Sequence, residues 1–281
     1  MANLLEPFQF TFMQDALLVG SVIAAMCAVL SCFLILKGWS LMGDAISHAV
    51  LPGIVLAYIA GIPLSVGAFA SGFFCAIGTG FIKQNSRLKE DTVMGVVFTG
   101  LFAFGLVLFS QTDSEMHLDH ILFGNILGIT QTQRTETFIL GGGIMLITLL
   151  LRRDLLLVCF DPAQARVLGL RAGFLNYLLL ALLSLGIVVS LKAVGIILVI
   201  AMLITPGCIA YLWTERFDKM LVIAIVSAVF STMLGILISY HIAGSTSACI
   251  VLVQTLSFVS SLFFAPKHGI MAKRKLGSPQ N

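Results

Sequence analysis

The chain has 281 residues, of which 59% are hydrophobic and only 10% charged, with a formal net charge of +3. A soluble domain carries about 25% charged residues, so this composition excludes a water-soluble globular protein, and the small positive excess gives no reason to expect nucleic acid as a partner. The apolar stretches are continuous rather than alternating. They predict an all-α protein, a polytopic helical bundle in a membrane.

Apolar stretches long enough to cross a bilayer occur at about nine places along the chain. In chain order they are 14–36, 39–61, 63–82, 92–110, 137–151, 173–191, 194–213, 220–240 and 248–265. The fifth is short, and the turn at Lys192 between the sixth and the seventh is tight, so eight spans are an alternative. Residues 1–265 form the predicted transmembrane domain, and 266–281 form a basic tail.

Lysine and arginine are distributed very unevenly between alternate loops. Of the 16 such residues, all but Arg134 and Lys192 fall in one set of loops. Cytoplasmic loops retain basic residues, so the richer set is predicted to be cytoplasmic. This set includes the segment 152–173 and the tail 266–281.

Apart from Asp15 at the outer end of the first span, the predicted spans contain one acidic residue, Asp44, and one histidine, His48. They are four residues apart, so a helix places both side chains on one face, close to the bilayer midplane. An ionised aspartate at that depth costs on the order of 2.5–3.5 kcal/mol on insertion scales and needs a partner or a water-filled path. A carboxylate and an imidazole suit divalent Mn, Fe or Zn. Asp44 and His48 are therefore the predicted metal ligands.

Pro52 lacks an N–H, which frees the carbonyl of His48 and predicts a bend in this helix. Two ligands from one helix are too few for a metal site, which normally takes four to six. A second copy of this chain, or a related chain, about a two-fold axis would double the number. In the alternative interpretation, Asp44 only N-caps a shorter helix that starts at Ala45, and His48 bonds a neighbouring carbonyl.

The stretch SLMGDAISHAVLPGIVLAYIAG resembles the signature of the ABC-3 family of metal-import permeases, which carry manganese, iron or zinc. The stretches KEDTVMGVVF, HILFGNILGI, FDPAQARVLGL and AVGIILVIAMLITPG are similar to further blocks of that family, in its order, over nearly the whole chain. The most similar branch is the Gram-negative manganese/iron branch, in which two different permeases pair. The segment YHIAGSTSACIVL departs from the family, which often has an acidic residue and Pro-Ser-Gly there, so no role is assigned to loop 241–247.

The resemblance implies a multi-pass permease of the bacterial inner membrane, working as a dimer with an identical or related permease subunit. Asp44 and His48 would bind the divalent ion in transit, with no permanently bound cofactor and no catalytic residues. The implied partners are a cytoplasmic ATP-binding subunit and a periplasmic metal-binding protein. The chain itself contains no GxxxxGK[ST] phosphate loop, so it is expected not to be an enzyme, with ATP hydrolysis on the separate subunit.

The segment 152–173 is predicted to contain a short helix, with Asp161 as N-cap, Pro162 in the first position and Gly169 at the end. The resemblance implies that this segment couples to the ATP-binding subunit, whereas local pattern alone also fits an ordinary connector. Two interpretations of the acidic loop 111–120 are open. In the first, the loop attracts cations or contacts the binding protein; in the second, it is a solvated connector without such a role.

Two other classes of function compete with the permease. An ion- or proton-coupled secondary carrier would use Asp44 and His48 as a proton relay. An intramembrane enzyme is the least favoured class, because neither HExxH nor GxSxG occurs in the sequence. The requirement for ATP separates the first two classes.

Overall fold

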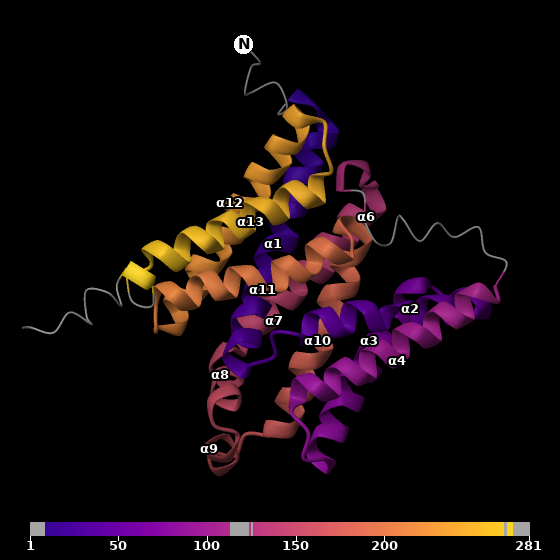
Figure 1. Cartoon of the computed structure of the whole chain (residues 1–281), viewed down its shortest axis with the longest axis vertical. Coiled ribbons are helices and arrows are strands. Elements are labelled where there is room, and N and C mark those ends of the chain that lie inside the picture. The colour runs from indigo at the N-terminus through magenta and orange to yellow at the C-terminus, as the bar shows by residue number, and fades with distance from the viewer. Residues whose placement is uncertain (1–8, 113–123, 125, 267–268, 272–281) are drawn as a thin grey trace, which may run out of the picture. The chain divides into compact units, whose positions relative to one another are not determined.

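The computed structural model describes residues 9–112, 124, 126–266 and 269–271, and every regular element in these residues is helical. This confirms the predicted all-α class (Figure 1). The elements are α1 (Thr11–Lys37), α2 (Met42–Ala60), α3 (Leu64–Asn85), α4 (Glu90–Ser110), η2 (Ile126–Gly128), α6 (Gln131–Glu136), η3 (Thr137–Gly141), α7 (Gly142–Leu150), α8 (Arg152–Phe160), α9 (Pro162–Val167), α10 (Ala172–Val194), α11 (Ile196–Trp213), α12 (Phe217–Ile242) and α13 (Thr246–Phe264).

Within the described part of the chain, 7 helical stretches are long and apolar enough to cross a membrane, as expected of a multi-pass membrane protein. One of them, Ala172–Trp213, contains both α10 and α11, which correspond to the predicted spans 173–191 and 194–213. The predicted span 137–151 is not among the seven. There the helix consists of the π-helical segment η3 followed by α7, which has only 9 residues.

The chain divides into two compact units. The first unit contains Met1–Gly38, Asn125–Leu149 and Ala201–Asn281, and the second contains Trp39–Gly124 and Leu150–Ile200. Each unit is therefore assembled from segments that are distant in sequence, and α11 passes from the second unit to the first.

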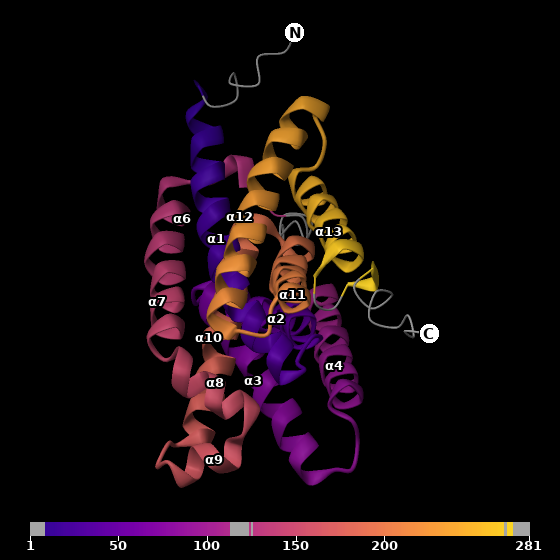
Figure 2. The same ribbon diagram turned by 90° about the vertical axis from the view of Figure 1, so that its left-hand side faces the viewer.

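In the first unit, α1 packs against α12 and η3, and α12 packs against α13 (Figure 2). Ser31 of α1 lies where Pro206 interrupts the hydrogen bonding of α11. The Ser31 hydroxyl donates to the Ile204 carbonyl at 3.2 Å and accepts the N–H of Gly207 at 2.9 Å. This side chain thus satisfies backbone groups that water cannot reach inside a bilayer.

A second polar contact of the first unit lies toward the start of α1. The Arg134 guanidinium of α6 donates to the Asp15 carboxylate at 2.6 Å. Both side chains are only partly exposed, so this charged hydrogen bond fixes α6 against the start of α1 more firmly than a solvated surface pair would.

In the second unit, α2 packs against α3, α4 and α10. The backbones of α2 and α3 meet at two glycines: a Cβ on Gly53 would lie 2.0 Å from the Gly67 carbonyl oxygen, and a Cβ on Gly67 would lie 2.1 Å from the Gly53 carbonyl oxygen. Small residues allow this close approach, which supplies the van der Waals contact that holds membrane helices together.

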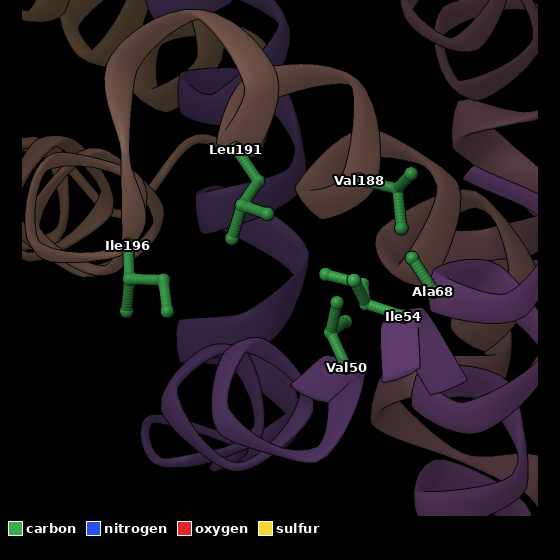
Figure 3. Packing of buried hydrophobic residues seen from close by; sticks show 6 residues of the cluster. All are labelled: Val50, Ile54, Ala68, Val188, Leu191 and Ile196. Carbon is green, nitrogen blue, oxygen red and sulfur yellow. The ribbon is translucent and has the colours of Figure 1, made fainter. Parts of the chain in front are cut away.

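The apolar core of the second unit forms where α2, α3 and α10 meet the start of α11 (Figure 3). Its members are Val50, Ile54, Ala68, Val188, Leu191 and Ile196, all of which are buried. This core and the glycine contact fix the axial position of α2, the helix that carries the predicted metal ligands.

Candidate metal site

Asp44 and His48 lie in the first half of α2. The helix begins at Met42 after Leu41, which makes no side-chain cap, so Asp44 is the third helical residue. The alternative interpretation, in which Asp44 caps a helix starting at Ala45, is therefore wrong. Asp44 instead occupies the first turn, where the exposed N–H groups of the helix end carry partial positive charge and stabilise a carboxylate.

The two side chains lie on one face of α2 and approach each other, as the spacing predicted. Asp44 Oδ1 is 3.3 Å from His48 Nε2, and the side chains are 31% and 30% exposed, respectively. Two ligand atoms about 3 Å apart can both reach one ion at the bond lengths of about 2.0–2.2 Å that are usual for nitrogen and oxygen. The pair therefore has the separation of two neighbouring ligands of a metal ion.

Two phenylalanines of α4 enclose the imidazole of His48. The Phe98 ring lies nearly parallel to it at a centroid distance of 5.9 Å, and the Phe102 ring lies edge-on at 5.3 Å. His48 Nδ1 is buried and has no hydrogen-bond partner among the described residues. The sequence analysis did not identify Phe98 or Phe102; the available signal was their spacing of four residues, which places both on one face of α4.

The part of α2 around Pro52 is contacted from two sides, and the bend there stays a prediction. The Ser71 hydroxyl of α3 donates to the Ala49 carbonyl of α2 at 2.6 Å, one residue after the carbonyl that Pro52 leaves without its helical donor. On the side of α4, Gly105 packs directly against the Pro52 ring. Ser71 is a further contributor to the site that the sequence analysis did not name.

The described residues supply two candidate metal ligands at this place. Among the described residues there is no group of three or more His, Cys, Asp or Glu side chains that could hold a metal ion. Asp44 and His48 thus remain a pair of candidate ligands. The acidic and histidine residues of the loop 111–120 (Asp113, Glu115, His117, Asp119 and His120) lie outside the described residues.

The segment 152–173 forms two short helices, α8 and α9. The predicted caps are confirmed: the Asp161 carboxylate accepts the N–H groups of Ala163 and Gln164, Pro162 occupies the first turn of α9, and Gly169 follows α9 with φ 80°. The helix α8 was not predicted. Three large apolar side chains of this segment are strongly exposed: Phe160 at 67%, Val167 at 86% and Leu168 at 65%.

The loop 241–247, which departs from the family pattern, is a tight turn between α12 and α13. The Ser239 hydroxyl donates to the Gly244 carbonyl at 2.8 Å and lies 2.8 Å from the Thr246 hydroxyl. Through these contacts Ser239 and Thr246 close the turn between the two helices.

A model of the ABC 3 transport family matches residues 9–265. The chain belongs to this family. This ABC 3 permease is 60% identical over 259 residues to the chelated iron transport system membrane protein YfeD of Yersinia pestis, with 92% of this chain and 87% of that protein covered. It is 51% identical over 278 residues to the manganese transport system membrane protein MntB of a Synechocystis species, with 98% and 91% covered.

Among solved structures, the ABC 3 permease is similar to a chain of PsaBC from Streptococcus pneumoniae in complex with Fab. The TM-score is 0.86 at 37% sequence identity, covering 96% of this chain and 98% of that chain. The likeness extends over the whole helical fold, so the resemblance expected from residues 40–61 and the later blocks is confirmed.

Proposed function

We propose that this chain is the membrane permease subunit of an ATP-driven importer of divalent manganese or iron, with zinc as a lesser substrate. Membership of the ABC 3 family and relatives named for iron and manganese transport support the class of substrate. The observation that carries the proposal is the Asp44–His48 pair, a carboxylate and an imidazole 3.3 Å apart on one apolar helix. Such ligands suit Mn, Fe and Zn alike.

The site is completed by a second permease subunit, identical or related. One chain contributes two ligand side chains, and a two-fold axis brings a matching pair from the partner, giving four. Manganese and iron bind carboxylate and imidazole ligands and accept further oxygen atoms, so water can fill the remaining positions. The ion is held near the bilayer midplane between the two subunits, and no metal is bound permanently.

Delivery to this site and release from it need other subunits. A periplasmic metal-binding protein supplies the ion, and a cytoplasmic ATP-binding subunit drives the change that releases it inward. The segment 152–173 is the docking surface for that subunit, because Phe160, Val167 and Leu168 expose apolar side chains beside a rigidly capped helix. In this proposal the chain is not an enzyme, resides in the bacterial inner membrane, and has its basic tail 266–281 in the cytoplasm.

Uptake of ⁵⁴Mn by proteoliposomes that contain the permease, its partner permease and the ATP-binding subunit tests the function. The proposal predicts that uptake requires ATP and is abolished by a hydrolysis-deficient ATP-binding subunit. A secondary carrier, the competing function, predicts uptake driven by an imposed proton gradient without that subunit. Gradient-driven uptake of this kind would overturn the proposal.

A further inference from the structure

The described part of the chain contains six buried side-chain nitrogen and oxygen atoms without a hydrogen-bond partner, and four of them lie in the helix pair α12–α13. They are the hydroxyl oxygens of Ser231 and Thr232 and both amide atoms of Gln254. The three side chains are 1%, 0% and 1% exposed, respectively. Burial of an amide without partners is unfavourable, so this concentration of unpaired polar atoms needs a physical explanation.

The packing of α12 on α13 places these groups at one level. A Cβ on Gly235 would lie 2.5 Å from the Ile250 Cα, so the two backbones touch there. The helices follow each other and run in opposite directions, and one turn from this contact Ser231 and Gln254 face the same part of the interface. Thr232 is adjacent, and its methyl group lies 3.1 Å from the position of a Cβ on Gly20 of α1.

The two hydroxyls also depart from the usual behaviour of serine and threonine in this protein. In other helices these side chains donate to the carbonyl four residues earlier, as Ser47, Thr148 and Ser190 do. Ser231 and Thr232 make no such bond. Their hydrogen-bonding capacity is therefore available to a ligand that lies between the helices.

We propose that Ser231, Thr232 and Gln254 form a buried site that binds water inside the α1–α12–α13 bundle. The chemistry of the donor set favours water over a cation. The hydroxyl and amide oxygens could bind a cation, but a cation cannot accept a hydrogen bond from the Gln254 amino group. Water can bond all of these groups, because it both donates and accepts hydrogen bonds. The site is distinct from the Asp44–His48 pair, which belongs to the other unit.

Thermal unfolding of the assembled transporter in nanodiscs tests this site with Gln254→Met, which keeps the side-chain length and removes both polar atoms. If water is bound, Gln254→Met lowers the Tm by several degrees because water and the two hydroxyls lose a partner. Gln254→Met combined with Ser231→Ala then lowers the Tm by less than the sum of the single variants. Thr255→Val is the control, since the Thr255 hydroxyl is exposed and bonds only the Val251 carbonyl.

A rise in Tm for Gln254→Met would overturn the proposal, because it would mean that the amide was unpaired in a dry interface. A density map of the same complex at about 2 Å resolution gives an independent outcome. Ordered water between Ser231 and Gln254 supports the site, and a direct hydrogen bond between the two side chains without water contradicts it.

A second inference concerns the aromatic pair around His48 and rests on the proposed function. Metal-binding histidines almost always donate their second ring nitrogen to a carboxylate, carbonyl or water, which raises the basicity of the ligand nitrogen. Here Nε2 faces Asp44, Nδ1 is buried with no carboxylate or carbonyl partner among the described residues, and the ring contacts Phe98 and Phe102. The phenyl rings orient the imidazole but supply no strong acceptor.

We propose that Phe98 and Phe102 are positioning residues that present Nε2 of His48 to the ion and keep it a weak ligand. Orientation favours binding, whereas the lack of an acceptor on Nδ1 limits how tightly the ion is held. Both effects suit an ion that must leave again after each ATP cycle, because a ligand set that is too basic would hold the metal in the membrane.

Binding of Mn²⁺ to the nucleotide-free transporter, measured by calorimetry, tests the two rings separately from transport. Phe102→Leu removes the edge-on ring and is expected to weaken Mn²⁺ binding about 10-fold, the lower end for residues that support a metal ligand. Phe98→Gln offers Nδ1 an amide oxygen and is expected to tighten binding while lowering the maximal uptake rate. Phe104→Leu, at a half-exposed position of the same helix, is the control.

The outcomes separate this inference from the proposed function. If Asp44→Asn abolishes Mn²⁺ binding but Phe102→Leu and Phe98→Gln both match Phe104→Leu, the positioning role is wrong and the site stands. If Asp44→Asn leaves Mn²⁺ binding unchanged, the site itself is wrong. Tighter binding together with slower uptake in Phe98→Gln is the combined result that a merely structural role of the ring would not produce.

Discussion

The close contact between α2 and α3 makes Gly53→Ala a quantitative test of how the ligand-bearing helix is held. The added Cβ would lie 2.0 Å from the Gly67 carbonyl oxygen, whereas ordinary van der Waals contact begins at 3.4 Å. The helices must therefore separate by about 1.4 Å, the difference between these distances, because the obstructing atom belongs to the backbone and cannot rotate away. Overpacking of this kind costs about 1–3 kcal/mol.

For a chain of this size 1 kcal/mol corresponds to a change in Tm of about 2–4 °C, so Gly53→Ala is expected to lower the Tm of the nanodisc-embedded transporter by about 2–12 °C. Uptake should fall as well, since Asp44 and His48 move with α2. Gly80→Ala in α3 is the matched control because no atom lies within 4 Å of its added Cβ. If the two variants had the same Tm, the close approach of α2 and α3 would be refuted.

Two further predictions concern the coupling segment and the interrupted helix α11. Gly169 has φ 80°, where an alanine is strained, so we expect Gly169→Ala to lower the metal uptake per ATP hydrolysed. Gly173→Ala is the control, because its added Cβ lies in open space. If both variants had the same ratio of uptake to hydrolysis, the segment 152–173 would be an ordinary connector and not a coupling segment. Ser31→Ala removes two hydrogen bonds to α11 and is expected to destabilise the transporter by about 1–3 kcal/mol in thermal unfolding. Thr255→Ala is the control and should leave the Tm unchanged. An unchanged Tm for Ser31→Ala would contradict the idea that Ser31 supports α11 next to Pro206.

Features that depend on neighbouring residues in sequence were predictable. The Asp161 cap, Pro162 in the first turn and Gly169 after the helix all follow from local backbone chemistry, and the structure confirms them. The Asp44–His48 contact follows from helical spacing alone. Hydropathy located the helices but not their ends: α3 continues to Asn85, past the predicted end at residue 82, because backbone hydrogen bonding persists after the apolar stretch has ended.

Features that depend on how helices rotate against one another were not predictable. The sequence has 21 phenylalanines, and a spacing of four residues does not single out Phe98 and Phe102, because Phe69 and Phe73 share it. The contact of Phe98 and Phe102 with His48 arises from the packing of α4 on α2. The hydroxyl of Ser71 reaches the Ala49 carbonyl near Pro52 for the same reason. The start of α2 was ambiguous because Ser40 and Asp44 are both good caps, and the helix begins between them without using either.

The most direct test of the metal site is Mn²⁺ uptake by proteoliposomes containing the complete transporter with Asp44→Asn. Asparagine keeps the shape of the side chain and its length toward His48 but removes the negative charge that a divalent ion requires. We predict that this variant inserts and assembles with the ATP-binding subunit normally, yet takes up almost no Mn²⁺. Near-normal uptake at matched expression would contradict the assignment of Asp44 and His48 as the residues that bind the transported ion.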